Sequence, residues 1–301
     1  MTADRNRSTW LFVAGQDRSG STLVGGVLAR QLGGFDCGEL HGLWVGLVEG
    51  RTCGCGVRLA ACPLWSAVAD EACAAAGLGD WEEAAAIMRD RLRRRHLLTP
   101  RLPAPRVAEL RLRRATEAAV ERLVGAPVVV DTSKLSSVLW TAAHIPRPLG
   151  VVHLVRDPRA VAFSQARPTP SPWRDGAPMR RRPPLLSASD WLRAQVTTER
   201  VVRHRDRVPA QPVAVRVRYE DLPGALDAAI GSIAGALHLD RRPAGDDEGT
   251  RHTIGGNTVR HGGRTVVRNE RWRDEMPALA RIATTALTAP LLGRYGYRVV
   301  G

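Results

Sequence analysis

Four apolar runs along the chain have the length and composition of buried β-strands. Each is rich in valine or leucine, and a glycine or a charged residue lies at or near its end. Short runs of this kind are typical of strands in a parallel sheet that is covered on both faces. We therefore predict strands over residues 9–15, 126–133, 149–157 and 211–222.

Between these runs, apolar residues recur at the three- and four-residue spacing of amphipathic helices. We predict helices over residues 21–33, 81–98, 106–124, 158–165, 189–208 and 222–238, and a final helix over 270–297. Ser189 or Asp190 is the predicted N-cap of the fifth of these helices, because a side-chain oxygen there can accept from a backbone N–H of the first turn. Pro277 predicts that the final helix begins or is interrupted near that position.

The alternation of strands and helices predicts an α/β fold of the P-loop-like kind. In this three-layer sandwich, a central, mainly parallel sheet has helices on both faces. We expect one domain over residues 1–301. Two stretches lack periodicity: residues 167–184 are rich in proline and arginine and predict a mobile loop, and residues 241–265 are charged and rich in glycine.

The net charge of +14 has two interpretations. One is an anionic partner such as nucleic acid. The other is the codon bias of a GC-rich bacterial genome, because 43 of the 44 basic residues are arginine (44 − 1) and Lys134 is the one lysine. We favour codon bias for most surface arginines. The N-terminus has no apolar signal segment and no apolar run is long enough to span a bilayer, so we expect a cytoplasmic protein.

Three of the five cysteines, Cys53, Cys55 and Cys62, lie close together in the chain. Their spacing does not match the usual zinc pattern, which has C-x₂₋₄-C pairs and four ligands. The interpretation we favour is buried free thiols. A local disulfide and a metal site remain alternatives.

The segment GQDRSGST, residues 15–22, lies at a predicted strand-to-helix turn. Gly15 and Gly20 have the spacing of a nucleotide-binding P-loop, but Ser21 occupies the position of its lysine. Backbone N–H groups and a helix N-terminus attract an anion there, and Arg18 can replace the missing positive charge. The candidate anion-binding residues are Arg18, Ser19, Gly20, Ser21 and Thr22.

A second candidate phosphate site follows the third predicted strand. Arg156 comes directly after the strand, and Ser164 lies eight residues further on, two turns into the next predicted helix. An arginine at a strand end and a hydroxyl on the following helix can bind one phosphate group.

Together these segments resemble the superfamily of sulfotransferases that use 3′-phosphoadenosine 5′-phosphosulfate (PAPS). The segments VVDTSK, VRYEDL and GGNTVR also resemble that family, as does CGELHGLW followed by CGCG and CPLW, a combination similar to its bacterial branch. The CGE part is similar to tyrosylprotein sulfotransferases. The resemblance implies that the first loop holds the 5′-phosphosulfate, that Arg156 and Ser164 hold the 3′-phosphate, and that no metal is required.

The resemblance also implies roles in catalysis. Glu39 is the expected base that takes the proton of the acceptor hydroxyl, and His41 is the second candidate. Lys134, at the end of the second predicted strand, is expected to meet the negative charge that develops during transfer. Asn257 and Arg260 are expected to close over the nucleotide, within a glycine-rich loop that orders on binding.

The predicted function is transfer of a sulfuryl group from PAPS to a hydroxyl of a small-molecule acceptor, a natural product or a sugar. One alternative is a kinase-like phosphotransferase with Lys134 and Asp131 as its lysine and magnesium carboxylate. Another is a non-catalytic nucleic-acid-binding protein. Its scattered arginines and an aromatic content of only 5% argue against this second alternative.

Overall fold

The computed structural model describes residues 7–93, 104–168, 171, 179, 181–222, 224–242, 251–256 and 270–299. Within these ranges one sheet contains β1 (Thr9–Ala14), β2 (Phe35–Gly38), β3 (Val128–Lys134), β4 (Leu149–Val155) and β5 (Val213–Arg218). The strands lie in the order β2-β3-β1-β4-β5, and all neighbouring strands are parallel. The predicted parallel central sheet is confirmed.

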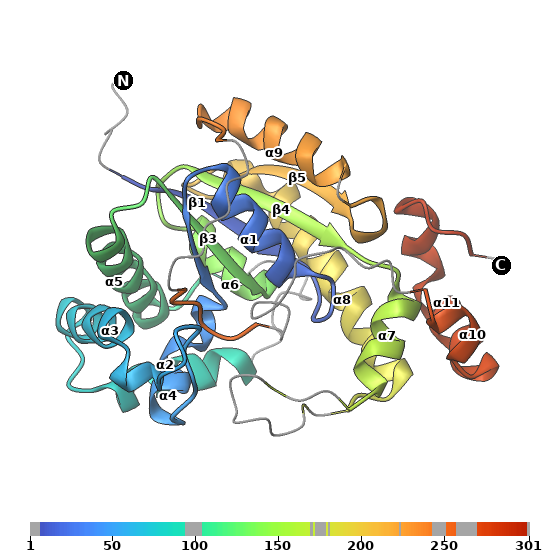
Figure 1. Ribbon diagram of the computed structural model, residues 1–301, viewed down its shortest axis with the longest axis horizontal. Helices are drawn as coiled ribbons and strands as arrows, with labels where there is room; N and C mark the ends of the chain where they lie inside the picture. Colours follow the sequence, from blue (N-terminus) through green and yellow to red (C-terminus); the bar gives the residue numbers. More distant parts are fainter. Residues whose placement is uncertain are drawn as a thin grey trace.

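Helices cover both faces of this sheet, which confirms the three-layer α/β sandwich. The helices described are α1 (Ser21–Gln31), α2 (Leu43–Val48), α3 (Pro63–Ala76), α4 (Trp81–Arg93), α5 (Val107–Val124), α6 (Ser136–Ala143), α7 (Pro158–Ala166), α8 (Pro184–Arg203), α9 (Gly224–Leu237), α10 (Trp272–Glu275) and α11 (Ala278–Arg294). Figure 1 shows α1 in front of the sheet and α6 and α8 behind it.

Strand β1 is apolar on both faces because it lies at the centre of the sheet. Trp10 and Phe12 pack into a core that includes residues of α3, α5 and α6. Leu11 and Val13 point the other way, into a core with residues of α1 and α9. Successive side chains of a strand point to opposite faces, so the unbroken apolar run WLFV is what a central strand requires.

Several elements differ from the sequence-based predictions. Strand β2 was not predicted, and neither were α2, α3 and α6. The predicted N-cap of α8 at Ser189 or Asp190 is wrong, because the helix begins at Pro184, with Pro183 as its N-cap. A proline at the first position fits there, since the first N–H groups of a helix have no intrahelical acceptor. The break near Pro277 is confirmed, because it separates α10 from α11.

The two predicted loops are described only in part. Most of 167–184 and of 241–265 lies outside the described residues, so the mobility of these loops and the single-domain boundary 1–301 stay predictions. The described part of the second loop, residues 251–256, forms a parallel bridge to β2 between Ile254 and Gly38. This contact places the segment at the edge strand of the sheet.

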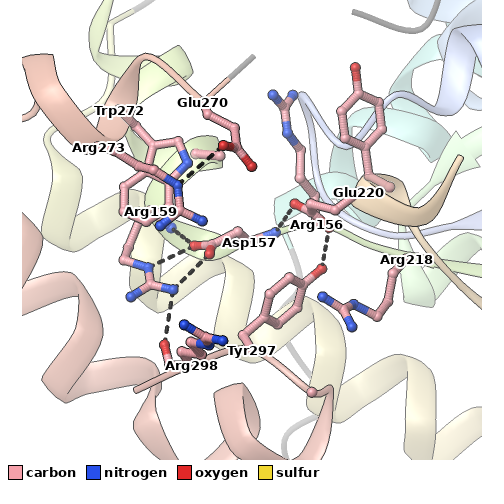
Figure 2. Close-up of a pocket in the computed structure, with 13 residues that line it drawn as sticks. Arg156, Asp157, Arg159, Arg218, Glu220, Glu270, Trp272, Arg273, Tyr297 and Arg298 are labelled. Carbon is pink, nitrogen blue, oxygen red and sulfur yellow. Dashed lines mark hydrogen bonds and ion pairs between the residues drawn. The ribbon is translucent and has the colours of Figure 1, made fainter. Parts of the chain in front are cut away.

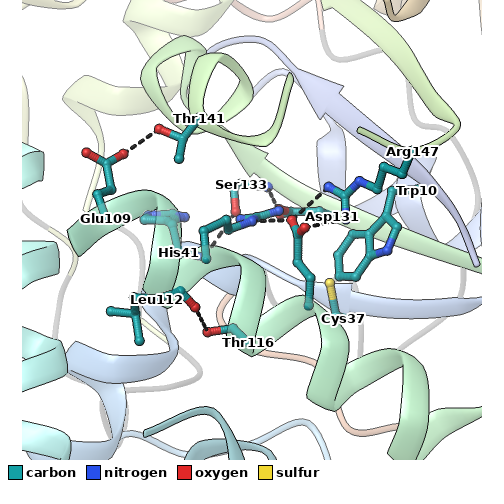
Figure 3. A network of polar contacts seen from close by, with 12 residues as sticks. Trp10, Cys37, His41, Glu109, Leu112, Thr116, Asp131, Ser133, Thr141 and Arg147 are labelled. Carbon is teal, nitrogen blue, oxygen red and sulfur yellow. Dashed lines mark hydrogen bonds and ion pairs between the residues drawn. The ribbon is translucent and has the colours of Figure 1, made fainter. Parts of the chain in front are cut away.

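A group of four buried charged residues lies between β3 and α5 (Figure 3), and we call it the interior cluster: Arg113, Glu117, Asp131 and Arg147. Arg113 donates to Asp131 at 2.7 Å and to Glu117, and Arg147 donates to Glu117 at 2.7 Å. The guanidinium of Arg147 lies 4.4 Å from the ring centroid of Trp10. Each charge in this cluster therefore has an opposite charge within hydrogen-bonding distance.

A membrane span was not expected from the sequence. Among the described helices, none combines the length and the hydropathy needed to cross a bilayer.

Candidate active site

Several of the predicted site residues lie at the edge of the sheet where the strands end: residues 15–22 follow β1, Glu39 follows β2, Lys134 ends β3 and Arg156 follows β4. In a parallel sheet the carboxyl ends of the strands share one edge, and ligands bind there at the point where the strand order reverses. Here the chain builds β2 and β3 on one side of β1 and then β4 and β5 on the other. The loop after β1 is therefore flanked by the ends of β3 and β4.

The loop after β1 has the form of an anion cradle. The N–H of Gly15 donates to the carbonyl oxygen of Lys134 at 3.1 Å, which fixes the loop against the end of β3. Gly20 has φ of 93° and is the N-cap residue of α1, whose first turn has no side-chain cap and no acidic residue. The open N–H groups and dipole of such a helix end favour an anion.

The hydroxyl groups of this loop point to the same function. Ser19 is buried, and its Oγ has no hydrogen-bond partner in the described part of the chain. A buried hydroxyl without a partner is uncommon, because desolvation then goes uncompensated. Ser21 begins α1 and is buried, and Thr22 lines a small cavity beside β2 and residues 251–256. The loop thus offers donors for an anionic ligand.

Arg156 joins this loop from the end of β4, as the sequence predicts. One of its guanidinium nitrogens donates to the carbonyl oxygen of Arg18 at 2.6 Å, and the guanidinium lies 4.3 Å from the ring centroid of Tyr219. The Tyr219 ring lies directly against Gly20, where an added Cβ would come within 2.5 Å of it. A glycine is therefore required at position 20 both by its φ and by this ring.

The predicted pairing of Ser164 with Arg156 at one phosphate stays a prediction. Ser164 is a half-buried residue near the C-terminal end of α7, and no hydrogen bond joins the two side chains, both of which the structure describes. Asn257 and Arg260 lie outside the described residues, so their predicted closure over a nucleotide stays a prediction.

Glu39 and Lys134 meet beside the anion cradle. Glu39 directly follows β2, Lys134 ends β3, and the Lys134 Nζ donates to the Glu39 Oε1 at 2.5 Å. The Nζ also lies 3.6 Å from a carboxylate oxygen of Asp17. We call Asp17, Glu39 and Lys134 the edge cluster. Burial opposes the charge on Lys134, but the two carboxylates more than offset it and raise the pKa of its ammonium.

Asp17 is a neighbour of Lys134 that the sequence-based predictions did not include. A carboxylate that points into an anion site would repel the anion. The side chain of Asp17 is 71% exposed, and one of its oxygens faces Lys134. The parallel topology predicts that residues 39 and 134 share an edge with the loop. It does not predict the orientation of a side chain within that loop.

Two residues of the site have a backbone conformation that side chains disfavour. Arg18 has φ of 71° and Lys134 has φ of 63°, both in the left-handed region. Non-glycine residues there store of the order of 1–3 kcal/mol, and such residues are concentrated at functional sites. Burial and the nearby Arg156 also lower the pKa of Arg18, although Asp17 and Glu39 act in the opposite direction.

His41, the second candidate base, lies on a different part of the edge. Its backbone N–H donates to the Oγ of Ser133 at 3.1 Å, and the N–H of Ser133 in turn donates to Asp131 (Figure 3). Asp131 thus orients the turn between β3 and α6. Its two oxygens are already bound by Arg113 and by Ser133, which argues against its use as a magnesium ligand in the kinase-like alternative.

A cavity of about 280 Å³ lies on the far side of Arg156. Figure 2 shows Arg159 bound to Asp157 beside it, and Tyr297 donating to Glu220 across it. Asp157 caps α7 by accepting from the N–H of Arg159. Five arginines and three carboxylates are among the described residues that line this cavity, so its lining has a formal charge of +2 (5 − 3).

Comparison with known protein families gives a match over more than half of the chain. The profile of the sulfotransferase family matches residues 11–243, a range that includes the anion cradle, Glu39, Lys134 and Arg156. None of the curated proteins matches the chain. Among solved structures, the chain is similar to the sulfotransferase domain from the Synechococcus PCC 7002 olefin synthase. The identity is 18%, the TM-score is 0.47, and the similarity covers 97% of this chain and 95% of that chain.

Proposed function

The chain belongs to the sulfotransferase family, and from this premise we propose that it moves the sulfuryl group of PAPS to a hydroxyl of a small-molecule acceptor. The observation that carries the proposal is the position of the Glu39–Lys134 pair directly beside the anion cradle. A base and a cation at that point are what transfer from a bound phosphosulfate to a hydroxyl requires.

The residues present fit such a donor. Among the residues that the structure describes, the buried Oγ of Ser19 has no hydrogen-bond partner, and the first turn of α1 has no acidic side chain. Arg156 is held at the loop by its contact with the Arg18 carbonyl. We propose that the 5′-phosphosulfate is held by Arg18, Ser19, Gly20, Ser21 and Thr22. Arg156 and Ser164 would hold the 3′-phosphate, and Asn257 and Arg260 would close over the nucleotide.

PAPS, when bound, supplies an activated sulfuryl group whose transfer to a hydroxyl releases the nucleotide bisphosphate. Glu39 accepts the proton of the acceptor hydroxyl, a role worth about 10²–10⁴-fold in rate. Lys134 orients the Glu39 carboxylate through its hydrogen bond and provides further N–H donors for charge that develops beside the loop. In-line transfer needs the acceptor oxygen and the leaving oxygen on opposite sides of the sulfur, and the base within reach of the acceptor hydroxyl. The base and the cradle both lie at the edge of the sheet, and His41 is the alternative base.

The donor is tested by thermal denaturation of the purified protein with 3′-phosphoadenosine 5′-phosphate, compared with ATP in the presence and absence of Mg²⁺. A ligand that binds only the folded protein, at about 100 times its Kd, adds about 2.7 kcal/mol to the unfolding free energy. We expect metal-independent stabilisation by the bisphosphate. Stabilisation by ATP only with Mg²⁺ would instead support the kinase-like alternative. Stabilisation by generic oligonucleotides alone, with a steep dependence on salt, would support nucleic-acid binding.

The acceptor is tested by turnover. Release of the bisphosphate from PAPS is measured with a panel of sugars and of phenolic and aliphatic hydroxyl compounds, with Glu39→Gln as the inactive control. Acceptor-dependent release by the native protein supports the proposal. Binding of the bisphosphate without release for any class of hydroxyl would contradict the acceptor part alone.

A further inference from the structure

Three cysteines and one histidine come together at one point outside the candidate active site. They are Cys53, Cys55, Cys62 and His252, and we call them the Cys₃His cluster. One potential ligand atom from each lies within 4.8 Å of every other. All three cysteines are free thiols. The local spacing of the cysteines does not reveal this arrangement, because the histidine is 190 residues away from Cys62.

Two backbone elements position the sulfur atoms: a tight turn and the start of helix α3. Thr52 and Arg58 pair as an antiparallel bridge, and the turn between them contains Cys53 and Cys55. Gly56, with φ of 92°, allows this tight turn, in which its N–H donates to the Cys53 carbonyl. Cys62 is the N-cap residue of α3, a helix of 14 residues.

The fourth group arrives from the segment 251–256. The N–H of Gly54 donates to the carbonyl oxygen of Thr253 at 2.9 Å, which docks the segment on the cysteine turn. The indole N–H of Trp65 donates to the carbonyl oxygen of His252 at 2.9 Å. These two contacts hold the His252 backbone so that its ring faces the cysteines.

One separation equals that of a tetrahedral zinc site, and a second is slightly shorter. The Sγ atoms of Cys55 and Cys62 are 3.8 Å apart, and the Cys62 Sγ is 3.2 Å from the His252 Nδ1. A tetrahedral zinc ion with Zn–S of about 2.3 Å and Zn–N of about 2.0–2.1 Å separates its ligand atoms by roughly 3.5–3.8 Å. Cys53 and Cys62 are fully buried, so the cluster is shielded from solvent on at least one side.

We propose that the Cys₃His cluster binds one zinc ion. Three thiolates and one imidazole are a usual ligand set for structural zinc, and soft sulfur ligands in tetrahedral geometry disfavour magnesium and calcium. All four positions are taken by the protein, so the ion has no open site for a substrate or a water. The zinc is structural, and the transfer chemistry does not use it.

The ion joins three segments that the sequence keeps apart: the cysteine turn, the start of α3, and residues 251–256. The last of these lies against the predicted base. Glu39 donates its backbone N–H to the Ile254 carbonyl at 2.6 Å, and an added Cβ on Gly255 would lie 3.2 Å from the Cβ of Glu39. The same segment leads directly into residue 257. Zinc would therefore fix both the backbone of Glu39 and the origin of the loop that carries Asn257 and Arg260.

The test is the metal content of the full chain, purified under reducing conditions without chelator and measured by plasma mass spectrometry. We expect about one zinc per chain. His252→Ala and Cys55→Ser should lose it, whereas Cys73→Ser, which removes a free cysteine elsewhere, should keep it. His252→Cys offers a fourth thiolate and should retain the zinc, which separates loss of a ligand from loss of the fold.

A second measurement uses the native protein alone, in case the variants do not fold. Zinc is removed with a strong chelator and replaced with cobalt(II), whose visible spectrum reports tetrahedral thiolate coordination. Reduced protein that holds no zinc and gives no such spectrum would overturn the proposal. An intact mass lower by two hydrogens, with no zinc, would replace it with a disulfide. Equal zinc in every variant would place the metal elsewhere. None of these measurements uses PAPS, so they test the zinc site independently of the proposed function.

Discussion

Two groups of charged residues share strand β3 and differ in almost every physical respect. The interior cluster contributes two arginines and two carboxylates, and every side chain in it is at most 8% exposed. The edge cluster has one lysine and two carboxylates, with Glu39 20% and Asp17 71% exposed. The formal charges cancel in the first and leave one negative charge in the second.

The difference separates charges that are paired inside the fold from charges that are incompletely balanced at the sheet edge, where we propose that the ligand binds. Buried ion pairs tolerate little change, because removal of one partner leaves an unpaired charge in a medium that solvates it poorly. In the edge cluster, Lys134 has a backbone in the left-handed region, the charges do not cancel, and the side chains of Asp17 and Glu39 are accessible to solvent. An arriving ligand can therefore rearrange the edge cluster, while the interior cluster holds β3 in place.

The largest predicted effect comes from breaking the edge cluster at its base. Glu39→Gln should lower kcat by about 10²–10⁴-fold, because the amide cannot take up the acceptor proton. Affinity for the bisphosphate should change little. Initial rates and thermal shifts measure the two effects, with Glu71→Gln on the surface pair with Arg122 as the matched control. Near-native turnover of Glu39→Gln would transfer the role to His41.

Breaking the interior cluster should give the opposite result. Glu117→Gln leaves Arg113 and Arg147 buried beside each other without their shared carboxylate, and should lower the unfolding free energy by about 3–5 kcal/mol. Urea denaturation measures this loss, and Glu71→Gln should cost less than about 1 kcal/mol. The kcat of the folded fraction should stay the same. A fall in kcat without a fall in stability would mean that the interior cluster belongs to the site.

A smaller effect is expected at Arg156, which contacts the anion cradle from the end of β4. Arg156→Ala removes a charge-assisted donor at the cradle and should weaken binding of the bisphosphate by about tenfold or more. Calorimetric titration gives the Kd, and Arg122→Ala is a control on an exposed arginine. Unchanged affinity would remove Arg156 from the nucleotide site.

The smallest effect is expected at the exposed member of the edge cluster. Asp17→Asn removes a negative charge near the cradle and should strengthen binding of the bisphosphate a few-fold, since such an interaction is worth about 1 kcal/mol or less in a water-like medium. The gain should shrink as ionic strength rises. Weaker binding in Asp17→Asn would show that Asp17 positions Lys134.

The sequence predicted the elements that carry strong periodicity and missed those defined by their neighbours. Strand β2 is four residues long and contains Asp36, so its apolar pattern is weak, and it is a strand because it pairs with β3. Helix α8 starts earlier than predicted. Its N-cap is Pro183 and its first residue is Pro184, whereas the prediction placed the N-cap at Ser189 or Asp190. Propensity is local, whereas pairing depends on the tertiary fold.

In the candidate site too, the sequence predicted positions along the chain better than contacts between side chains. Gly15–Thr22, Glu39, Lys134 and Arg156 were predictable because a parallel sheet brings strand ends to one edge. Side-chain orientations were not predictable: Asp17 faces Lys134, and Tyr219 covers Gly20. His252 carries no local signal at all, because its partners are brought to it only by the folding of residues 251–256 against β2.

The single lysine of this chain has a practical consequence for spectroscopy. Lys134 is 5% exposed and paired with Glu39, and the other basic side chains are arginines or histidines. Protein grown on lysine labelled with ¹³C and ¹⁵N would therefore give one side-chain ammonium signal in an NMR spectrum. That signal would report the ionisation of the edge cluster, and its response to a ligand, without any substitution or chemical tag.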